Sequence, residues 1–360
     1  MKKILVLVPN KNARGGITNY YDSLKNYFGK DIIYLTRGAR NWPKKQFFLF
    51  EVFRLFKDFF KFILIISKRD IKLIQTTTSF STNALFRDSI YILLSKIFNK
   101  KVIVFYRGWD ELLVKKIEKH GLFLFKWVYF KADAFIDLAS TNIETLRKWG
   151  YKKSIFLETT VVDNKLIEGI NYENIKMKYG KNQEFKILFL ARVEKTKGVY
   201  ELISTYNLLK VEFPNISLII AGDGNELVKV KEFAKNSKDI IFRGFVSGQE
   251  KADLFKECQL FFFPSYFEGM PNSVLEAITC GMPVVTRRVG GLIDFFKDNV
   301  HGYITDSKDP EIYKNLISSL IKDPEICKKI AIDNFDYGGT RFLANKVVER
   351  VEQIYKQILN

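Results

Sequence analysis

The chain has 360 residues, of which 47% are hydrophobic, and a formal net charge of +18. This length exceeds one ordinary domain and suits two domains that each bury a core. The three cysteines are odd in number and lie in apolar segments, which excludes a disulfide-stapled secreted domain and indicates reduced thiols of a cytoplasmic protein. The two histidines have no cysteine or carboxylate at ligand spacing, so we expect no zinc site.

The positive charge is unevenly distributed along the chain. Residues 1–165 contain 31 Lys and Arg against 14 Asp and Glu, whereas residues 166–360 contain 27 against 26. The first half is therefore expected to meet an anionic partner, and the second half is not. A nucleic-acid binder would share this charge, but the sequence carries no signature of an RNA-binding or DNA-binding module, so we expect no nucleic-acid partner.

The first half begins with an apolar segment, residues 4–8, that is too short for a signal peptide and is typical of a buried strand. No apolar run reaches the roughly 18 residues that a membrane-spanning helix needs. Short β-like runs then alternate with helical stretches. The strands expected in this half are residues 4–8, 72–75, 101–106, 134–138 and 155–158.

The second half repeats this alternation after a polar segment, residues 168–186, which predicts a linker with a short helix. Its expected strands are residues 185–191, 217–221, 240–242, 260–264 and 283–286. The pattern predicts an α/β protein with two Rossmann-like, doubly wound parallel sheets facing a cleft. Residues 340–359 have a helical period and are expected to cross back to the first domain. We therefore predict an N-terminal domain of residues 1–167 plus 340–360 and a C-terminal domain of residues 168–339.

Residues 42–62 are rich in aromatic side chains, with nine Phe or Trp among twenty-one residues. On a helix, one side would carry Phe53, Phe56, Phe60 and Ile63. The basic residues beside it are Arg54, Lys57 and Lys61. This favours a helix that lies on an anionic membrane and meets the acceptor, although a buried helix with solvated lysines has the same pattern. A second aromatic stretch, residues 122–131, favours the buried alternative.

Several short motifs follow the expected strands, at the strand ends where open α/β sheets bind ligands. Gly15 and Gly16 lead into a helix and allow close approach of a phosphate or sugar, although a plain turn has the same sequence. Arg192 and Lys197 offer a planar fork and a point charge to a diphosphate, and a solvated basic turn is the alternative. Three further pairs or triplets are Gly222-Asp223-Gly224, Gly244-Phe245-Val246 and Gly290-Gly291.

The most specific motif places two carboxylates, Glu268 and Glu276, eight residues apart around a turn that runs into a helix. Backbone amides at the start of that helix favour a bound anion. The residues between the carboxylates are Gly269, Met270, Pro271, Asn272, Ser273, Val274 and Leu275. A ligand with hydroxyls at both ends and phosphates between them is a nucleotide-sugar, so this segment predicts a nucleotide-sugar site.

The order of these motifs resembles glycosyltransferase family 4, the retaining nucleotide-sugar enzymes with a GT-B fold. The resemblance is specific over most of residues 185–300. It is looser in the first half, where it rests on Gly15-Gly16, on the segment from Ala134 to Ser140 and on Asp163.

The resemblance implies a role for each matching residue. Glu268 would bond the hydroxyls of the donor sugar and Glu276 those of the ribose, while Arg192 and Lys197 hold the diphosphate. The amides around Ser273 and Val274 would assist, and Phe245 and Val246 would seat the base. The remaining donor-site residues are expected to be Gly15, Gly16, Gly222, Asp223, Gly269, Met270, Pro271 and Asn272.

The resemblance also implies how the reaction proceeds. Acceptor attack and phosphate departure take place on the same face, so the leaving phosphate takes the acceptor proton and no protein nucleophile is required. The sequence contains no Asp-x-Asp triplet of the kind that metal-using glycosyltransferases rely on, so we expect no metal and no other cofactor. A UDP-sugar is favoured over a GDP-sugar as donor.

One position departs from the family. Arg107 stands where these enzymes often carry a histidine that contacts the transferred sugar, and an arginine cannot act as a base at neutral pH. We expect an electrostatic role or binding of an acceptor phosphate, with Asp110 pairing with Arg107.

The sequence thus predicts a retaining glycosyltransferase of hexosyltransferase type. It would work at the inner membrane face on a saccharide or lipid-linked acceptor in bacterial surface polysaccharide synthesis, such as lipopolysaccharide O-antigen, capsule or exopolysaccharide. The alternative is a GT-B-like scaffold that binds nucleotide-sugar without transferring it, and the arginine at position 107 keeps that alternative open.

Overall fold

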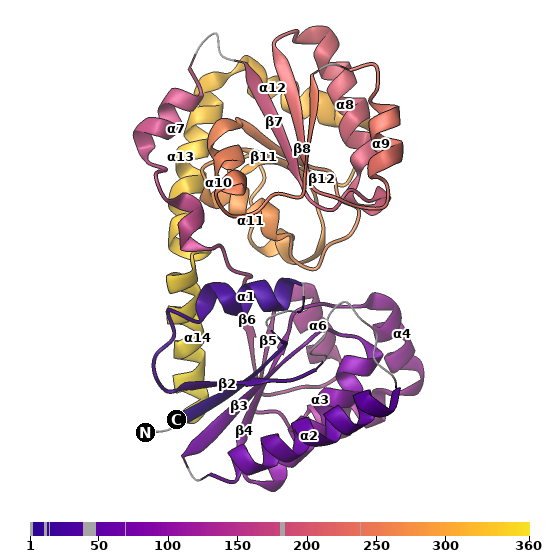
Figure 1. Cartoon of the computed structure of the whole chain (residues 1–360), viewed down its shortest axis with the longest axis vertical. Coiled ribbons are helices and arrows are strands. Elements are labelled where there is room, and N and C mark those ends of the chain that lie inside the picture. Colours follow the sequence, from indigo (N-terminus) through magenta and orange to yellow (C-terminus); the bar gives the residue numbers. More distant parts are fainter. Residues whose placement is uncertain are drawn as a thin grey trace. The chain divides into compact units, whose positions relative to one another are not determined.

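The structure is a computed structural model that describes residues 3–10, 13, 15–38, 48–68, 70–180, 184–237 and 239–360. The chain divides into two compact units (Figure 1). Unit 1 comprises Met1–Thr160 and Ala344–Asn360, and unit 2 comprises Val161–Leu343. The boundaries therefore lie at 160/161 and 343/344, whereas the sequence places them at 167/168 and 339/340.

Unit 1 contains a sheet of six parallel strands in the order β2-β1-β3-β4-β5-β6. The strands are β1 (Lys3–Val8), β2 (Ile32–Thr36), β3 (Ile71–Thr78), β4 (Lys101–Tyr106), β5 (Ala134–Asp137) and β6 (Ser154–Leu157). All five strands expected in this half are confirmed, and β2 is the one that the sequence did not predict. It is an edge strand in which only Leu35 is buried and the other four residues are half-buried.

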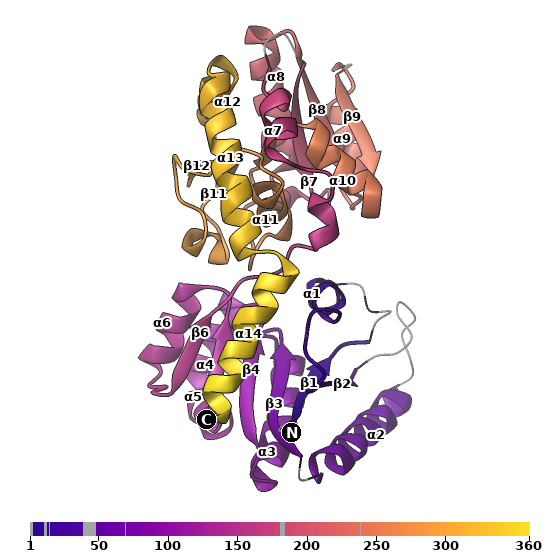
Figure 2. The ribbon, with the colours of Figure 1, turned by 90° about the vertical axis from the view of Figure 1, so that its left-hand side faces the viewer.

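The helices of unit 1 lie on both faces of this sheet. They are α1 (Gly16–Leu24), α2 (Phe48–Ile66), α3 (Thr82–Ile97), α4 (Glu111–His120), α5 (Leu122–Tyr129), α6 (Ser140–Lys148) and α14 (Ala344–Leu359). Helix α1 connects β1 to β2, toward one edge of the sheet. Helices α2, α3 and α4–α5 connect β2 to β3, β3 to β4 and β4 to β5, toward the other edge. Right-handed crossovers therefore place α1 on one face and the others on the opposite face. Figures 1 and 2 show α14 on the α1 side.

Unit 2 contains a second sheet of six parallel strands, in the order β12-β11-β10-β7-β8-β9. Its strands are β7 (Phe185–Leu190), β8 (Ile216–Ala221), β9 (Ile240–Gly244), β10 (Leu260–Phe263), β11 (Val284–Arg287) and β12 (Gly302–Thr305). Its α-helices are α7 (Tyr172–Lys178), α8 (Val199–Glu212), α9 (Leu227–Phe233), α10 (Gly248–Glu257), α11 (Asn272–Thr279), α12 (Pro310–Lys322) and α13 (Pro324–Arg341). The sequence predicted the first five strands and the short helix α7, but it missed the edge strand β12.

The C-terminal helix begins later than the sequence predicts. Helix α13 ends at Arg341 and α14 begins at Ala344, because Phe342 is buried and its carbonyl accepts the N–H of Val162 at 2.8 Å. Within unit 1, Arg350 of α14 donates to both carboxylate oxygens of Glu158 at 2.9 and 3.0 Å. The expected return of the C-terminal helix to the first domain is therefore confirmed.

The cysteines are buried in unit 2 and none of them forms a disulfide, as the sequence predicts. Burial raises the pKa of each thiol, Cys258, Cys280 and Cys327, to about 12. Within the described ranges, no three His, Cys, Asp or Glu residues cluster so that they could hold a metal ion. Of the helices that the structure describes, none has the length and apolar character needed to cross a membrane.

Candidate functional site

Arg192, Lys197 and the segment from Glu268 to Glu276 follow β7 and β10, where the strand order of the unit 2 sheet reverses. From β7 the chain proceeds to β8 and β9 on one side, then returns to β10 beside β7 and continues to β11 and β12. The loops after β7 and β10 are therefore neighbours at the carboxyl edge of the sheet. Such a switch point is where open α/β sheets bind ligands.

Two close backbone approaches fix the loop after β10 against its neighbours. A Cβ atom at Gly198 would lie 2.2 Å from the carbonyl oxygen of Pro264, and one at Gly290 would lie 2.1 Å from that of Glu268. Both glycines have positive φ, at 72° and 50°, which side chains rarely adopt. Because only glycine fits at these two positions, the loops carrying Lys197 and Glu268 are held side by side.

Lys197 and Glu268 consequently form an ion pair. Lys197 ends a 3₁₀ turn, η2 (Lys195–Lys197), and its Nζ lies 2.5 Å from Oε1 of Glu268, with both side chains 14% exposed. The hydroxyl of Ser265 donates to the same oxygen at 2.9 Å. Oε2 of Glu268 has no partner among the described residues and is open to a ligand. The sequence predicted Lys197 and Glu268 but assigned no role to Ser265.

Arg192 follows β7 and lies on the surface. Its Nη1 pairs with Oε1 of Glu194 at 2.6 Å, and its side chain is 70% exposed. An exposed ion pair of this kind contributes little free energy, so a bound anion can replace Glu194 as the partner of Arg192.

Glu276 and the amides before it belong to α11. Nζ of Lys251, from α10, lies 2.8 Å from Oε1 of Glu276. No side chain caps the start of α11. The N–H groups of Asn272 and Ser273 donate to no backbone carbonyl in the described part of the chain, whereas that of Val274 donates to Pro271 at 3.2 Å. Two of the predicted amides are thus available to a ligand, and the third is engaged in the helix.

The predicted base-binding residues follow β8 and β9. Gly222 donates from its N–H to the carbonyl of Gly244 at 2.6 Å, which joins the two strand ends. Asp223 and Phe245 are exposed, and Val246 is buried. In the remaining part of the predicted segment, Pro271 is buried, Met270 is half-buried and Gly269 is exposed.

In unit 1, Gly15 and Gly16 start α1, and a Cβ atom at either position would meet open space. Arg107 follows β4. Its guanidinium lies 3.9 Å from the ring centroid of Tyr20, and Nη2 donates to Oγ1 of Thr160 at 2.9 Å. The Nε and Nη1 atoms of Arg107 are buried and lack a hydrogen-bond partner. Burial lowers the pKa of this guanidinium.

The expected pairing of Asp110 with Arg107 is wrong. Asp110 is exposed and caps α4, where it accepts the N–H groups of Leu112 and Leu113 at 2.9 and 3.1 Å. An aspartate directly before a helix satisfies amides that would otherwise have no partner, and this local interaction competes with a pair to Arg107.

The aromatic row of α2 is exposed. Phe53, Phe56 and Phe60 are 71%, 70% and 64% exposed, and the fourth exposed apolar residue of the row is Leu64. Ile63, expected on this side, is half-buried. Of the basic residues, Lys57 and Lys61 are exposed and Arg54 is half-buried. The opposite side of the helix supplies Phe62 and Ile66 to the core.

The second aromatic stretch is only partly buried, which corrects the expectation of a buried helix. In α5, Phe125, Val128 and Tyr129 pack in the core, whereas Phe123, Leu124 and Trp127 are exposed. Phe86 of α3 is also exposed. Ile97, the last residue of α3, is exposed as well. Because α2, α3 and α5 cover the same face of the sheet, we define the exposed apolar residues of these helices, other than the helix-terminal Ile97, as the apolar face of unit 1. Its members are Phe53, Phe56, Phe60, Leu64, Phe86, Phe123, Leu124 and Trp127.

The chain is similar to known proteins both in sequence and in fold. Residues 171–334 match the family model of glycosyl transferases group 1. These residues belong to that family. An uncharacterized glycosyltransferase of Methanocaldococcus jannaschii is 25% identical over 332 residues, covering 89% of this chain and 82% of the relative. The N,N'-diacetylbacillosaminyl-diphospho-undecaprenol alpha-1,3-N-acetylgalactosaminyltransferase of Campylobacter jejuni is 27% identical over 243 residues. The match covers 66% of this chain and 63% of that relative.

Among solved structures, Anabaena HepE in complex with UDP and glucose has a TM-score of 0.72 at 17% identity. The match covers 99% of this chain and all of that one. The predicted GT-B fold class, the resemblance to the family and the prediction of a glycosyltransferase are confirmed.

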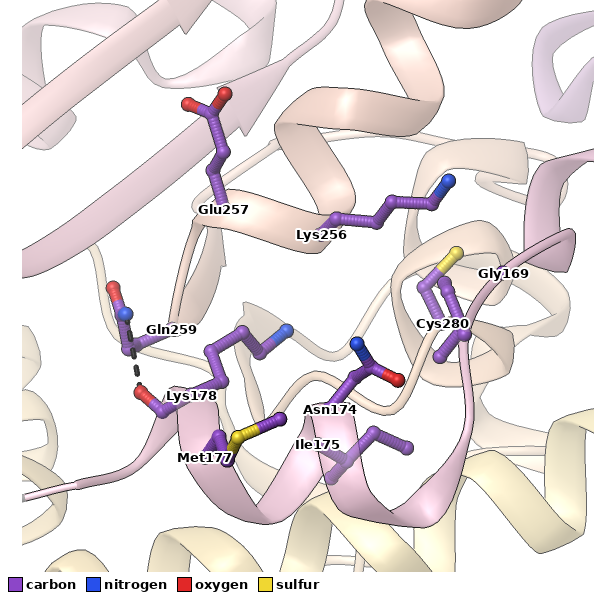
Figure 3. A pocket seen from close by; sticks show the side chains of 10 residues that line it. Gly169, Asn174, Ile175, Met177, Lys178, Lys256, Glu257, Gln259 and Cys280 are labelled. Carbon is purple, nitrogen blue, oxygen red and sulfur yellow. Dashed lines mark hydrogen bonds between the residues drawn. The ribbon is translucent and has the colours of Figure 1, made fainter.

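A cavity of about 330 Å³ lies elsewhere in unit 2 of this glycosyltransferase (Figure 3). Among its lining residues are Asn174, Lys178, Lys256 and Cys280. Burial lowers the pKa of Lys178 to about 8. The cavity contains none of the predicted donor residues, and it lies near Gln259, at the amino end of β10 rather than at the carboxyl edge.

The approach of Gly290 to Glu268 predicts the effect of a substitution. Gly290→Ala places a Cβ where no space exists and where φ is positive, so we expect unit 2 to be destabilised by about 1–3 kcal/mol in urea unfolding. Gly269→Ala, next to Glu268 and with open space, is the control and should change stability by less than about 0.5 kcal/mol. Equal stability of the two variants would contradict the assigned role of this contact.

Proposed function

We propose that this glycosyltransferase moves a hexose-type residue from a nucleotide-diphosphate sugar, with retention, onto a saccharide or lipid-linked acceptor in bacterial surface polysaccharide synthesis. One observation supports this most: Lys197, Glu268 and Glu276 lie at the switch point of the unit 2 sheet, in the order that a nucleotide-sugar requires. The named activity of the Campylobacter relative, which uses a diphospho-undecaprenol acceptor, favours the lipid-linked alternative.

The donor is proposed to lie along the segment from Glu268 to Glu276. Glu268 accepts hydrogen bonds from sugar hydroxyls through its open oxygen. A carboxylate suits this task because both of its oxygens accept, whereas a side-chain amide has one accepting oxygen and one donating nitrogen. The diphosphate meets Arg192, Lys197 and the free amides at the start of α11. A UDP-sugar is favoured, consistent with UDP in the HepE structure, and no metal or other cofactor is proposed.

Lys197 is assigned to the leaving group. An ammonium that already lies against Glu268 has further N–H donors to direct at a phosphate oxygen. Charge on the β-phosphate grows as the glycosidic bond breaks, so this contact strengthens in the transition state more than in the ground state. The leaving phosphate accepts the acceptor proton.

Arg107 is proposed to bind an anionic group of the acceptor. A buried guanidinium with two unpartnered nitrogens is costly, and an anion such as an acceptor phosphate would satisfy them. Arginine also matches phosphate geometry with two parallel hydrogen bonds.

The apolar face of unit 1 is proposed to lie on the inner membrane surface, which makes the protein a peripheral membrane protein of the cytoplasm. Three neighbouring helices expose large apolar side chains there, with the basic side chains of Lys57 and Lys61 beside them. Exposed apolar area flanked by lysines suits an anionic bilayer. A lipid-linked acceptor would then be presented to the same unit.

The proposed donor can be tested by thermal unfolding with UDP-, GDP- and ADP-sugars. We expect the largest rise in Tm with a UDP-sugar, because a ligand at a hundred times its Kd stabilises by about 2.7 kcal/mol. If no nucleotide-sugar raises the Tm, the proposed donor site is wrong.

Substitution of Lys197 separates transfer from binding. We expect Lys197→Ala to lower kcat at least about a hundredfold and to weaken donor binding less, whereas Glu276→Ala mainly weakens binding. Lys195→Ala, in the same turn and exposed, should leave both unchanged. Full turnover by Lys197→Ala would disprove the leaving-group role. Donor binding without transfer to any acceptor by the wild type would instead favour the scaffold alternative.

Membrane association is tested by co-sedimentation with anionic liposomes at moderate salt. We expect Phe53→Ser/Phe56→Ser/Phe60→Ser to reduce binding at least about tenfold, because three side chains lose apolar burial. The matched control substitutes three exposed apolar residues of unit 2 with Ser: Met177, Val211 and Val228. The same absence of binding by wild type and triple variant would refute the proposal.

A further inference from the structure

The two carboxylates of the donor segment share an arrangement that the sequence did not predict. Each has Oε1 held by a lysine from another loop or helix, Lys197 for Glu268 and Lys251 for Glu276. In each, Oε2 has no partner in the described part of the chain. One oxygen therefore fixes the orientation of the carboxylate and the other remains open to a ligand.

Lys251 stands in an unfavourable place for a purely structural lysine. It is the fourth residue of α10, near the helix N-terminus, where the dipole disfavours a positive charge. Its Nζ bonds no residue of its own helix but lies 2.8 Å from Glu276 on α11. The side chains of Lys251 and Glu276 are 25% and 13% exposed, so the pair is partly removed from water and from screening by salt.

The location of Lys251 relates it to the nucleoside end of the donor. Helix α10 follows β9 and the predicted base-binding pair Phe245 and Val246. Glu276 is the carboxylate that the proposed function assigns to the ribose. A lysine that fixes one oxygen of Glu276 sets the direction in which the other oxygen can accept from a ribose hydroxyl.

We propose that Lys251 is a positioning residue that orients Glu276 and thereby makes the site select ribonucleotides over 2′-deoxyribonucleotides. This inference rests on the proposed function, because it requires that Glu276 binds the ribose. Lys251 itself does not need to touch the donor. Removing it leaves Glu276 free to rotate, so the hydroxyl contacts weaken while contacts to the base and the diphosphate remain.

The test compares the affinity of each variant for a nucleoside diphosphate and for its 2′-deoxy analogue by calorimetry. The nucleotide is UDP, GDP or ADP, whichever gives the largest thermal protection. We expect the wild type to prefer the ribonucleotide by at least about tenfold, as one hydrogen bond to a charged group provides. Lys251→Met should reduce this preference to about threefold or less, mainly by weakening ribonucleotide binding.

Three further variants complete the experiment. Lys251→Arg keeps the pair with Glu276 and should restore most of the preference, and Glu276→Ala should abolish it. Lys256→Met is the matched control, because Lys256 is on the same helix but lines the separate cavity. It should keep the wild-type preference. Melting without nucleotide establishes that each variant is folded.

Two results would overturn the inference, and they have different meanings. If Lys251→Met weakens both nucleotides equally or neither, Lys251 does not orient Glu276, while the proposed role of Glu276 stands. If Glu276→Ala keeps the preference for the ribonucleotide, or the wild type has none, Glu276 does not bind the ribose. The inference then fails together with that part of the proposed function.

Discussion

The proposed donor site depends on two places where one backbone packs directly against another. The carbonyl oxygens of Pro264 and Glu268 occupy the space that side chains at positions 198 and 290 would fill. These contacts bring the loops after β7, β10 and β11 together at one edge of the sheet. The ion pair of Lys197 with Glu268 then follows from the backbone, since both side chains extend from loops that cannot separate. Backbone packing at this edge thus sets the positions of Lys197 and Glu268 relative to each other.

Charge is organised differently in the two units. In unit 2 the two cations proposed to hold the diphosphate, Arg192 and Lys197, are already paired with carboxylates. In the proposed complex, the diphosphate replaces Glu194 as the partner of Arg192, whereas Lys197 keeps its pair with Glu268 and directs its remaining N–H donors at the phosphate. In unit 1 the guanidinium of Arg107 is buried without a carboxylate partner. This matches the sequence, in which the second half is nearly neutral and the first half carries the excess of positive charge.

The sequence was sufficient for the parts of the fold that rest on strong hydrophobic patterns. The eight strands inside the two sheets were all predicted. Of the four edge strands, which all contain half-buried or exposed residues, β6 and β9 were predicted and β2 and β12 were missed. Motif order located Lys197, Glu268 and Glu276, but not the contacts of Ser265 and Lys251, because those partners are far apart in sequence and carry no local signal. The expected contact of Asp110 with Arg107 is absent because Asp110 caps helix α4 instead. The exposed side of α2 depended on tertiary packing, which turned Phe62 inward.

The three thiols have a practical consequence for studying this enzyme. Because Cys258, Cys280 and Cys327 are buried and their pKa values are raised to about 12, they remain protonated and poorly nucleophilic at neutral pH. A cysteine introduced on the surface would then react far faster than the native ones. The wild-type background is therefore suited to attaching a single fluorophore or spin label, for instance on α2 or beside the proposed base-binding residues, without first removing any native cysteine.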